Sequence, residues 1–282
     1  MRSSITTPVV FAHWAARLPR VDKTRPENEK LKSRRPKKRR LFPGETLDDL
    51  LYGELKLIQK KAGVRYSVDA LLLADFILPE IKPGHKILDL GTGSGVIAMV
   101  MAKRSKAGQI IGIEIQESLA QMARRSVEMN CLEKRIKILN QDAREARKIF
   151  KPSSFDVIVS NPPFRKKGTG ILSQNQERSI ARYELALTMA GLLKICRSLV
   201  KAKGKVALIY PFERLKELVA ELAKTKLNPS RLKLVFHKKS DPLPILFCME
   251  LRKGKTRLLL EPPCYVETDQ GRFRVGRDDK MI

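Results

Sequence analysis

Acidic residues are scarce in this chain relative to basic ones. Its 282 residues include 30 Asp and Glu against 57 Lys and Arg, which gives a formal net charge of +27 and a pI of about 10.2. The first 40 residues carry +10 of that charge (13 basic minus 3 acidic), and the remaining 242 carry +17 (44 minus 27). Such an excess is unusual for a metabolic enzyme and favours a polyanionic partner, most simply nucleic acid; a generic basic surface is the alternative.

Histidine and cysteine are also few. The chain has three histidines, and its four cysteines are never spaced as CxxC (Cys131, Cys196, Cys248 and Cys264). The usual zinc-site spacings are therefore missing, so we expect no metal centre and a reducing, cytoplasmic environment. No apolar run reaches the roughly 18 residues of a membrane helix. The apolar stretch at 8–16 is short and contains His13, so we expect neither a membrane span nor a signal peptide.

Residues 1–44 form a basic arm without the apolar spacing of a folded segment. Within it, residues 30–40 read KLKSRRPKKRR, a proline-broken run that cannot bury a core. We expect the arm to be disordered. Three interpretations of it stay open: an RNA-binding arm, a targeting segment, or an over-extended start of translation. One folded domain is predicted at 45–268 and a C-terminal tail at 269–282.

Short apolar segments alternate with helical patterns throughout that domain. Residues 46–67 predict a short helix and a hairpin-like lead-in, followed by a buried helix at 67–78 with Ser67 as its N-cap. Strands are predicted at 86–90, 109–115, 135–142, 155–160, 205–211, 231–238 and 244–253. Further helices are predicted at 95–105, 116–130, 178–201 and 212–225.

The connection between the last two predicted strands is short, and its length decides their direction. It reads KSDPLP, whereas a parallel crossover needs roughly a dozen residues or more, so the two strands must be antiparallel. The alternation of strands and helices elsewhere predicts a parallel sheet covered on both faces. The fold class is therefore α/β and Rossmann-like, with seven mostly parallel strands, an antiparallel last strand and helices on both faces.

A glycine-rich loop, DLGTGSG, follows the first of these strands, where this architecture binds nucleotides. Its spacing is GxGxG and not the GxGxxG of dinucleotide-binding loops, and such turns also serve simply to pack a helix on a strand. A carboxylate just before the glycines would repel a pyrophosphate but would suit a ligand with an ammonium and a sulfonium group. The cofactor-binding residues predicted here are Asp89, Gly91, Thr92, Gly93 and Gly95.

The next two strands also end at acidic residues. Glu114 ends the second strand, where a carboxylate can accept from both hydroxyls of a ribose. Asp142 ends the third, where it could accept from an adenine amino group, with Ala143 beside the ring. One such acid could be a helix cap or a solvated side chain. Three at successive strand ends favour S-adenosylmethionine over NAD or ATP.

The fourth strand ends in an unusual sequence, FDVIVSNPPF at 155–164. Neither proline can donate a backbone hydrogen bond, and each fixes φ near −65° and restricts the residue before it. The stretch therefore holds backbone carbonyls and one amide in a fixed array that could accept hydrogen bonds from a flat NH2 group. The catalytic residues predicted here are Asn161, Pro162, Pro163 and Phe164.

Together these motifs are similar to those of class I S-adenosylmethionine-dependent methyltransferases. The order DLGTGSG, strand-end Glu114, QDA and SNPPF carries the resemblance, and Asn-Pro-Pro-aromatic marks the amino-methylating NPPY/NPPF branch. The flanking segments at 46–76, 173–187 and 251–266 resemble the bacterial tRNA(Val) adenine-N6 methyltransferases, whose substrate is the adenosine just 3′ of the anticodon. The resemblance implies a methyltransferase domain at about 45–268 and excludes the basic arm. It also implies an S-adenosylmethionine cofactor and an RNA substrate, tRNA first.

The resemblance also implies roles for the Asn-Pro-Pro-Phe residues. The Asn161 side-chain oxygen and the Pro162 carbonyl would accept the two hydrogens of the adenine amine and aim its lone pair at the methyl group, so Asn161 also borders the cofactor. Phe164 would stack on a base drawn from a single-stranded loop. The basic run that follows is predicted to contact RNA phosphates, an ordinary solvated loop being the alternative. Its residues are Arg165, Lys166 and Lys167.

Other activities stay open at this stage. The same motif serves methylation of amino groups in ribosomal RNA and of glutamine-N5 in proteins, although a charge of +17 outside the arm argues against a protein substrate. A non-catalytic RNA-binding factor on the same fold would be expected to have a damaged loop or motif, and both are intact here. The sequence does not predict an oligomeric state.

Overall fold

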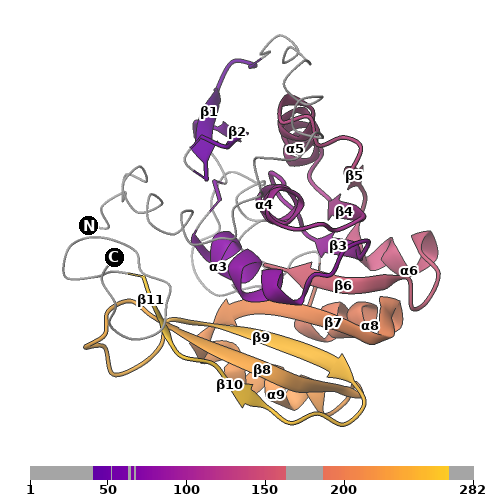
Figure 1. Cartoon of the computed structure of the whole chain (residues 1–282), viewed down its shortest axis with the longest axis vertical. Helices are drawn as coiled ribbons and strands as arrows, with labels where there is room; N and C mark the ends of the chain where they lie inside the picture. The colour runs from indigo at the N-terminus through magenta and orange to yellow at the C-terminus, as the bar shows by residue number, and fades with distance from the viewer. Residues whose placement is uncertain (1–40, 52, 63–64, 67, 163–186, 267–282) are drawn as a thin grey trace.

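A mostly parallel sheet with helices on both faces forms the centre of the molecule (Figure 1). The structure is a computed structural model, and it describes residues 41–51, 53–62, 65–66, 68–162 and 187–266. The expected arm up to residue 40, the segment 163–186 and the tail from residue 267 lie outside the described residues.

Seven strands form the body of the described sheet, in the spatial order β8-β9-β7-β6-β3-β4-β5. Strands β7, β6, β3, β4 and β5 pair in parallel, whereas β9 is antiparallel to both of its neighbours, β7 and β8. The predicted seven strands and the antiparallel last strand are therefore confirmed. The bounds are Lys86–Leu90 (β3), Gln109–Glu114 (β4), Ile136–Asn140 (β5), Phe155–Ser160 (β6), Val200–Pro211 (β7), Leu227–Phe236 (β8) and Leu246–Lys253 (β9).

The chain after β9 has structure that the sequence did not predict. Two short strands, β10 (Leu259–Leu260) and β11 (Cys264–Tyr265), pair in parallel with β8 along its outer edge. They extend the described sheet to nine strands. The backbone N–H of Val266 donates to Phe236 O at 2.9 Å, so the last described residue lies beside the carboxyl end of β8.

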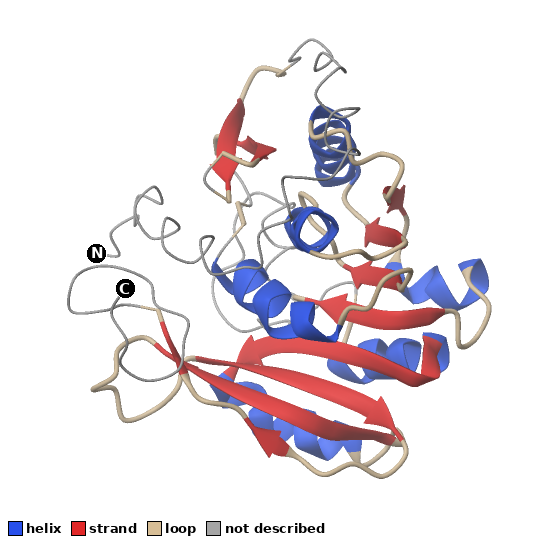
Figure 2. Cartoon of the chain, viewed as in Figure 1, coloured by secondary structure: helices blue, strands red, loops and turns tan. Residues whose placement is uncertain are grey.

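Two sets of helices cover the two faces of the sheet (Figure 2). Because neighbouring residues of a strand point to opposite faces, Ile87 of β3 packs into one core and Leu88 into the other. Helices α3, α4 and α5 bury one face, and α6, α8 and α9 bury the other. Their bounds are Val68–Ile77 (α3), Val96–Arg104 (α4), Glu117–Met129 (α5), Ala146–Ile149 (α6), Met189–Leu199 (α8) and Leu215–Leu222 (α9).

The prediction of a short helix within 46–67 was wrong, whereas the prediction of a hairpin in the same segment was confirmed. Strands β1 (Glu45–Leu50) and β2 (Leu55–Lys60) form an antiparallel pair, and no described residue between 46 and 66 is helical. Positive φ angles at Leu51 (52°) and Gly53 (78°) make the turn between them. The hairpin is anchored on α5, where Ser126 Oγ accepts from the backbone N–H of Ile58 at 2.9 Å. This long-range contact decided the structure of a segment whose leucine spacing also suited a helix.

Within the described residues, the helix expected at 178–201 covers only Met189–Leu199. Helix α8 begins at Met189, because Thr188 is its N-cap and accepts from the backbone N–H of Gly191 at 3.2 Å. At the other end Val200 already belongs to β7, where it pairs with Phe155. The part of the prediction at 178–186 lies outside the described residues.

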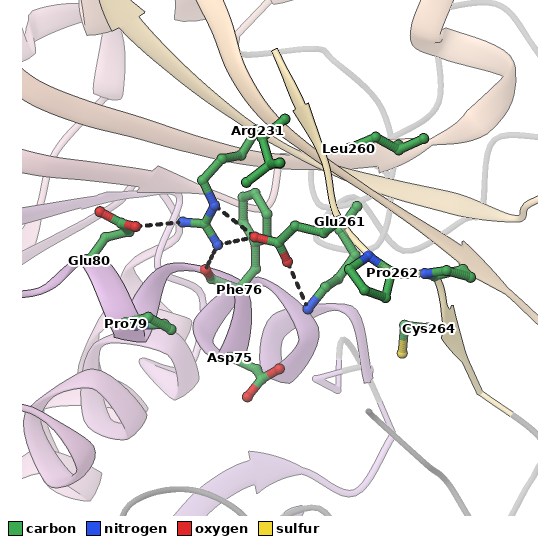
Figure 3. A pocket seen from close by; sticks show the side chains of 12 residues that line it. Asp75, Phe76, Pro79, Glu80, Arg231, Leu260, Glu261, Pro262 and Cys264 are labelled. Carbon is green, nitrogen blue, oxygen red and sulfur yellow. Dashed lines mark hydrogen bonds and ion pairs between the residues drawn. The ribbon is translucent and has the colours of Figure 1, made fainter. Parts of the chain in front are cut away.

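A buried ionic cluster joins the outer edge of the sheet to α3. Arg231 of β8 pairs with Glu250 of β9 at 3.0 Å, donates to the backbone oxygen of Phe76 in α3 at 3.0 Å, and contacts Glu261 just after β10. Glu250 is fully buried and also accepts from Ser230 Oγ at 2.7 Å. Figure 3 shows the guanidinium of Arg231 lying between Glu80, Glu261 and the backbone oxygen of Phe76. The segment after β9 is therefore tied to the main domain.

We predict that Arg231→Ala destabilises the protein by about 3 kcal/mol, because fully buried Glu250 would lose one of its charged partners and keep Arg252 at 2.7 Å, while Glu261 would also lose its contact with Arg231. Urea unfolding followed by circular dichroism measures this free energy. The matched control is Lys224→Ala, which breaks an exposed pair with Glu221 (2.7 Å) and should cost less than about 1 kcal/mol. Similar losses in the two variants would show that the Arg231 cluster does not carry the stability we assign to it.

Candidate functional site

The predicted site residues lie at one edge of the sheet, at the carboxyl ends of four neighbouring strands. Strands β6, β3, β4 and β5 are adjacent and parallel, so their carboxyl ends meet there. Asp89 lies near the end of β3, Glu114 ends β4, Asp142 follows β5 and Asn161 follows β6. The structure thus brings together residues that are spread over more than 70 positions of the sequence.

The glycine loop after β3 has a backbone that other residues would rarely adopt. Gly91, Gly93 and Gly95 have φ angles of 76°, 57° and 85°, all in the left-handed region that favours glycine. A side chain built on Gly91 or Gly93 would meet no atom within 4 Å, so both face open space. The backbone N–H groups of Gly91 and Thr92 both donate to Ile113 O at 2.9 Å. The loop is therefore held to β4 by its backbone.

Asp89 is a fully buried carboxylate that points into this loop. Its Oδ2 accepts from Thr92 Oγ1 at 2.6 Å, while its Oδ1 has no hydrogen-bond partner among the described residues. Burial raises the pKa of Asp89 to about 7. Hydrogen bonds from Thr92 and from the backbone of Ala98 oppose this rise, and the charge of Glu114 adds to it. A buried carboxylate with one oxygen unpaired is costly unless a donor, best a cation, completes it.

Glu114 braces the glycine loop from the neighbouring strand. It is nearly buried, and its two oxygens accept from the backbone N–H groups of Gly93 (Oε2) and Gln116 (Oε1), both at 2.9 Å. Burial raises the pKa of Glu114, and these backbone hydrogen bonds oppose the rise. Each carboxylate oxygen keeps further acceptor capacity, so the predicted contacts with ribose hydroxyls stay possible alongside this bracing role.

Two residues beside this pair were missed from the sequence. Gln116 is almost fully buried, and its Oε1 has no hydrogen-bond partner among the described residues, next to Glu114. Gly112 of β4 lies behind the loop, where a Cβ would come within 2.8 Å of the Thr92 side chain and 2.9 Å of Ile138 Cδ1. The spacing of Gln116 two residues after Glu114 was visible in the sequence, but the packing of Gly112 against Thr92 has no local signal.

Both carboxylate oxygens of Asp142 already accept hydrogen bonds from Arg144, a partner that was not predicted from the sequence. Its Oδ1 accepts from the backbone N–H of Arg144 at 2.8 Å, and its Oδ2 accepts from Nε of the same residue at 2.8 Å. Burial raises the pKa of Asp142, but the hydrogen bonds and charge of Arg144 outweigh it and lower the pKa overall. Asp142 caps η2 (Ala143–Glu145), which positions the partly buried Ala143 beside the edge. Contacts of either residue with an adenine stay a prediction.

The predicted catalytic segment is described only at its start. Ser160 ends β6 and its Oγ donates to Leu90 O at 2.7 Å, which joins the ends of β6 and β3. Asn161 is half-buried and Pro162 is buried directly after it. The remaining predicted catalytic and RNA-binding residues lie outside the described residues, namely Pro163, Phe164, Arg165, Lys166 and Lys167.

The described residues fit S-adenosylmethionine. Asp89 offers an unpaired carboxylate oxygen for an ammonium group, and the open space at Gly91 and Gly93 leaves room for the ligand along the loop. Glu114 and Gln116 offer acceptors on the next strand for hydroxyl groups. A phosphate-bearing nucleotide fits less well, because two buried carboxylates line the loop.

A pocket of about 560 Å³ lies elsewhere, between α3 and the segment after β9. It is lined by residues such as Asp75, Arg231 and Cys264 (Figure 3), and none of its lining residues comes from the glycine loop. In the described parts of the chain, no cluster of His, Cys, Asp or Glu suits a metal ion. No helix in those parts has the length and apolarity to cross a bilayer.

Comparisons with known proteins place the site in context. The profile of the Methyltransferase small domain family matches residues 66–221. A protein of Bacteroides thetaiotaomicron named tRNA1(Val) (adenine(37)-N6)-methyltransferase is 33% identical over 166 residues, which cover 58% of this chain and 65% of that relative. A protein of Porphyromonas gingivalis with the same name is 32% identical over 190 residues, which cover 66% of this chain and 73% of the relative.

Among solved structures, a predicted O-methyltransferase from Agrobacterium tumefaciens has a TM-score of 0.57 and 22% sequence identity. The superposition covers 73% of this chain and 91% of that one. At this identity the likeness concerns the fold, and it confirms the Rossmann-like arrangement predicted from the sequence.

We predict that the affinity for S-adenosylmethionine rises with pH between about 5.5 and 7, by up to about tenfold per pH unit. The reason is that the pKa of Asp89 is raised to about 7, so the carboxyl is increasingly ionised over this range and attracts the ammonium group. The cofactor's own amino group titrates higher, near 7.7–8.0 for an α-amino group. Isothermal calorimetry across this range measures the effect.

The matched variants for this prediction are Asp89→Asn and Asp156→Asn. Asp89→Asn should bind more weakly and lose the pH dependence. Asp156 lies at the opposite edge of the sheet, where it accepts from the backbone N–H of Lys86 at 2.9 Å, so its variant should keep the slope. A slope that persists in Asp89→Asn would rule out Asp89 as the titrating group.

Proposed function

Because the chain belongs to the Methyltransferase small domain family, we propose that it is an S-adenosylmethionine-dependent methyltransferase that methylates N6 of an adenosine in tRNA beside the anticodon. The observation that carries this proposal is that Asn161 and Pro162 come directly after β6, the strand beside β3, at the edge where Asp89 and Glu114 are buried. The names of the relatives, tRNA1(Val) (adenine(37)-N6)-methyltransferase, support the substrate. The four free cysteines fit the cytoplasm as the place of action.

Asp89, Glu114 and the glycine loop would hold the cofactor, which supplies an electrophilic methyl group on a sulfonium when bound. Asp89 would accept from its ammonium, and Glu114 and Gln116 from its ribose hydroxyls. The glycine backbone is fixed before any ligand arrives, because Glu114 and Ile113 already accept its N–H groups. Binding therefore requires little ordering of the loop.

Asn161 would orient the amine that is methylated. The lone pair of an adenine amine is conjugated with the ring, so the nitrogen is a poor nucleophile until its hydrogens are held out of the way. The side-chain oxygen of Asn161 and the carbonyl of Pro162 are the acceptors that the described segment supplies. Both would stabilise the positive charge that develops on nitrogen, and both are positioned by the Ser160–Leu90 hydrogen bond that anchors the end of β6.

No strong base is needed to complete the transfer. The cofactor, which Asp89 and Glu114 would hold, would supply the methyl group to the nitrogen and keep the electron pair of the broken carbon–sulfur bond. The methylated amine then carries a positive charge and loses one proton to water. The protein's contribution is alignment of nitrogen with the methyl group.

We predict that Asn161→Ala lowers kcat for tRNA by about 100-fold or more and leaves S-adenosylmethionine affinity nearly unchanged, as removal of one oriented hydrogen-bond acceptor does. Unmodified tRNA is incubated with protein and cofactor, and N6-methyladenosine is measured by nucleoside mass spectrometry. The control is Asn228→Ala, since Asn228 is exposed at the opposite end of β8 and donates to Gly254 O at 2.8 Å.

Other outcomes of this experiment have distinct meanings. Equal loss of turnover and cofactor affinity in Asn161→Ala would contradict the role assigned to Asn161. N6-methyladenosine formed only in ribosomal RNA would keep the chemistry and discard the tRNA substrate. Methylation of a glutamine-bearing protein, with no methylated nucleoside from either RNA, would replace the adenine substrate by an amide.

A further inference from the structure

The turn between β8 and β9 stands at the same edge of the sheet as the candidate site. β8 is antiparallel to β9, which is antiparallel to β7, so β8 runs parallel to β7 and β6. The carboxyl end of β8 and the start of β9 therefore lie at the edge that holds Asn161. β8 is three strands from β6, which is about 14 Å at roughly 4.8 Å per strand.

This turn rises beyond the level of the site. Ser160 at the end of β6 lies level with Leu208 of β7, and β7 then continues for three residues to Pro211. Pro211 lies level with Leu246 at the start of β9, which in turn lies level with Val235. Three residues correspond to about 10 Å of strand. The ends of β7, β9 and β8 thus form a wall on the side of Asn161 away from the glycine loop.

The top of this wall is basic and carries an exposed apolar side chain. The turn reads HKKSDPLPI at 237–245, and the side chains of Lys238 and Lys239 are exposed. The turn contains one carboxylate, Asp241, whose Oδ2 accepts from the backbone N–H of Lys238 at 2.9 Å. Leu243 is 65% exposed, so an apolar side chain stands in solvent on the same turn as the two lysines.

The wall is rigid before any partner binds. The backbone N–H of Ile245 donates to Val235 O at 2.7 Å, and the N–H of Phe212 after β7 donates to Ile245 O at 3.0 Å. The rings of Phe236 and Tyr265 lie 5.9 Å apart at the base of the turn, which ties it to β11. The turn therefore presents its lysines from a fixed scaffold and loses little entropy on binding.

We propose that this turn, residues 237–245, binds the sugar-phosphate backbone of the single-stranded RNA that flanks the target adenosine. The inference rests on the proposed function and adds the direction from which the substrate enters. The cofactor half of the edge lies over β3, β4 and β5, so the nucleotides that flank the target pass on the other side of β6, over the wall. A distance of about 14 Å spans roughly four stacked nucleotides at ~3.4 Å each. Lys238 and Lys239 neutralise phosphates there, and Leu243 offers an apolar surface to a base.

The test compares two double variants with matched charge changes. Lys238→Glu/Lys239→Glu changes the turn, and Lys203→Glu/Lys255→Glu changes two exposed lysines at the opposite edge of the sheet. Binding of unmodified tRNA is measured by filter binding or anisotropy at several salt concentrations, and S-adenosylmethionine affinity by calorimetry. A third variant, Lys238→Gln/Lys239→Gln, removes the charge without reversing it and guards against misfolding of the reversed one; thermal unfolding is recorded for all three.

We expect the turn variant to bind tRNA at least tenfold more weakly, with unchanged cofactor affinity. The slope of log affinity against log salt should fall by about 1.4, or ~0.7 for each single-strand phosphate that the turn no longer neutralises. In steady-state kinetics KM for tRNA should rise while kcat changes little. The control variant should lie within about twofold of the unaltered protein, and the glutamine variant should fall between the two.

Equal weakening of tRNA binding in the turn and control variants would overturn the proposal in favour of a generic basic surface. Unchanged tRNA binding in both variants would also overturn it. If the turn variants lower the binding of a glutamine-bearing protein and not of RNA, the partner assignment is wrong. Binding is measured without turnover, so the two proposals fail separately. If the turn variants weaken tRNA binding but the unaltered protein forms no N6-methyladenosine, the proposed adenine reaction is wrong and the turn is still an RNA contact. Normal methylation by the turn variants, with an unchanged KM for tRNA, would keep the adenine reaction and rule out the turn as an RNA contact.

Discussion

Parallel pairing of β6, β3, β4 and β5 is the constraint on which the rest of the molecule depends. Parallel strands must be joined by crossovers and buried on both faces, so their helices cover the sheet and leave only the strand ends accessible. All four carboxyl ends then meet at one edge, where the loops that follow the strands bring their backbone and side chains together. Asp89, Glu114 and Asn161 are neighbours for this reason alone, and any chemistry that uses them must take place there.

The electrostatics of this edge narrow the ligand further than its shape does. Asp89 is fully buried and Glu114 nearly so, and burial raises the pKa of both, which means that the ionised forms of these carboxylates are held at a cost in free energy. Glu114 recovers part of that cost by accepting two backbone N–H groups, but Asp89 keeps one oxygen without a partner among the described residues. A cationic ligand offsets the remaining cost, whereas a phosphate would add to it. Binding of a positively charged cofactor, as proposed above, would therefore stabilise the loop, and the same imbalance raises the pKa of Asp89 to about 7.

The sequence predicted the strand ends well because two local signals coincide there. Apolar runs such as KILDL and FDVIVS need burial on both faces, and the residues that follow them are polar or glycine, so β3 and β6 were predicted directly. The failures share a cause. The 46–60 segment became a hairpin because the backbone N–H groups of Ile58 and Lys56 donate to Ser126 of α5 and to Asn130 just after it. Gly112 packs against Thr92. Arg231 contacts Phe76, Glu250 and Glu261, and Phe76 is 155 positions from it in the sequence. Contacts of such long range leave no periodic trace in the chain.

The antiparallel last strand gives the sheet two unequal halves. A crossover helix between β8 and β9 would have returned the chain at the amino edge, and the connecting turn would have stood far from the site. The hairpin instead keeps the turn at the carboxyl edge, and the three extra residues of β7 lift it above Asn161. One half of the edge thus carries buried acids that suit a small cation, and the other carries an exposed basic turn that suits a polyanion. β6 lies at the boundary between them, which is where a group transferred from one ligand to the other has to pass.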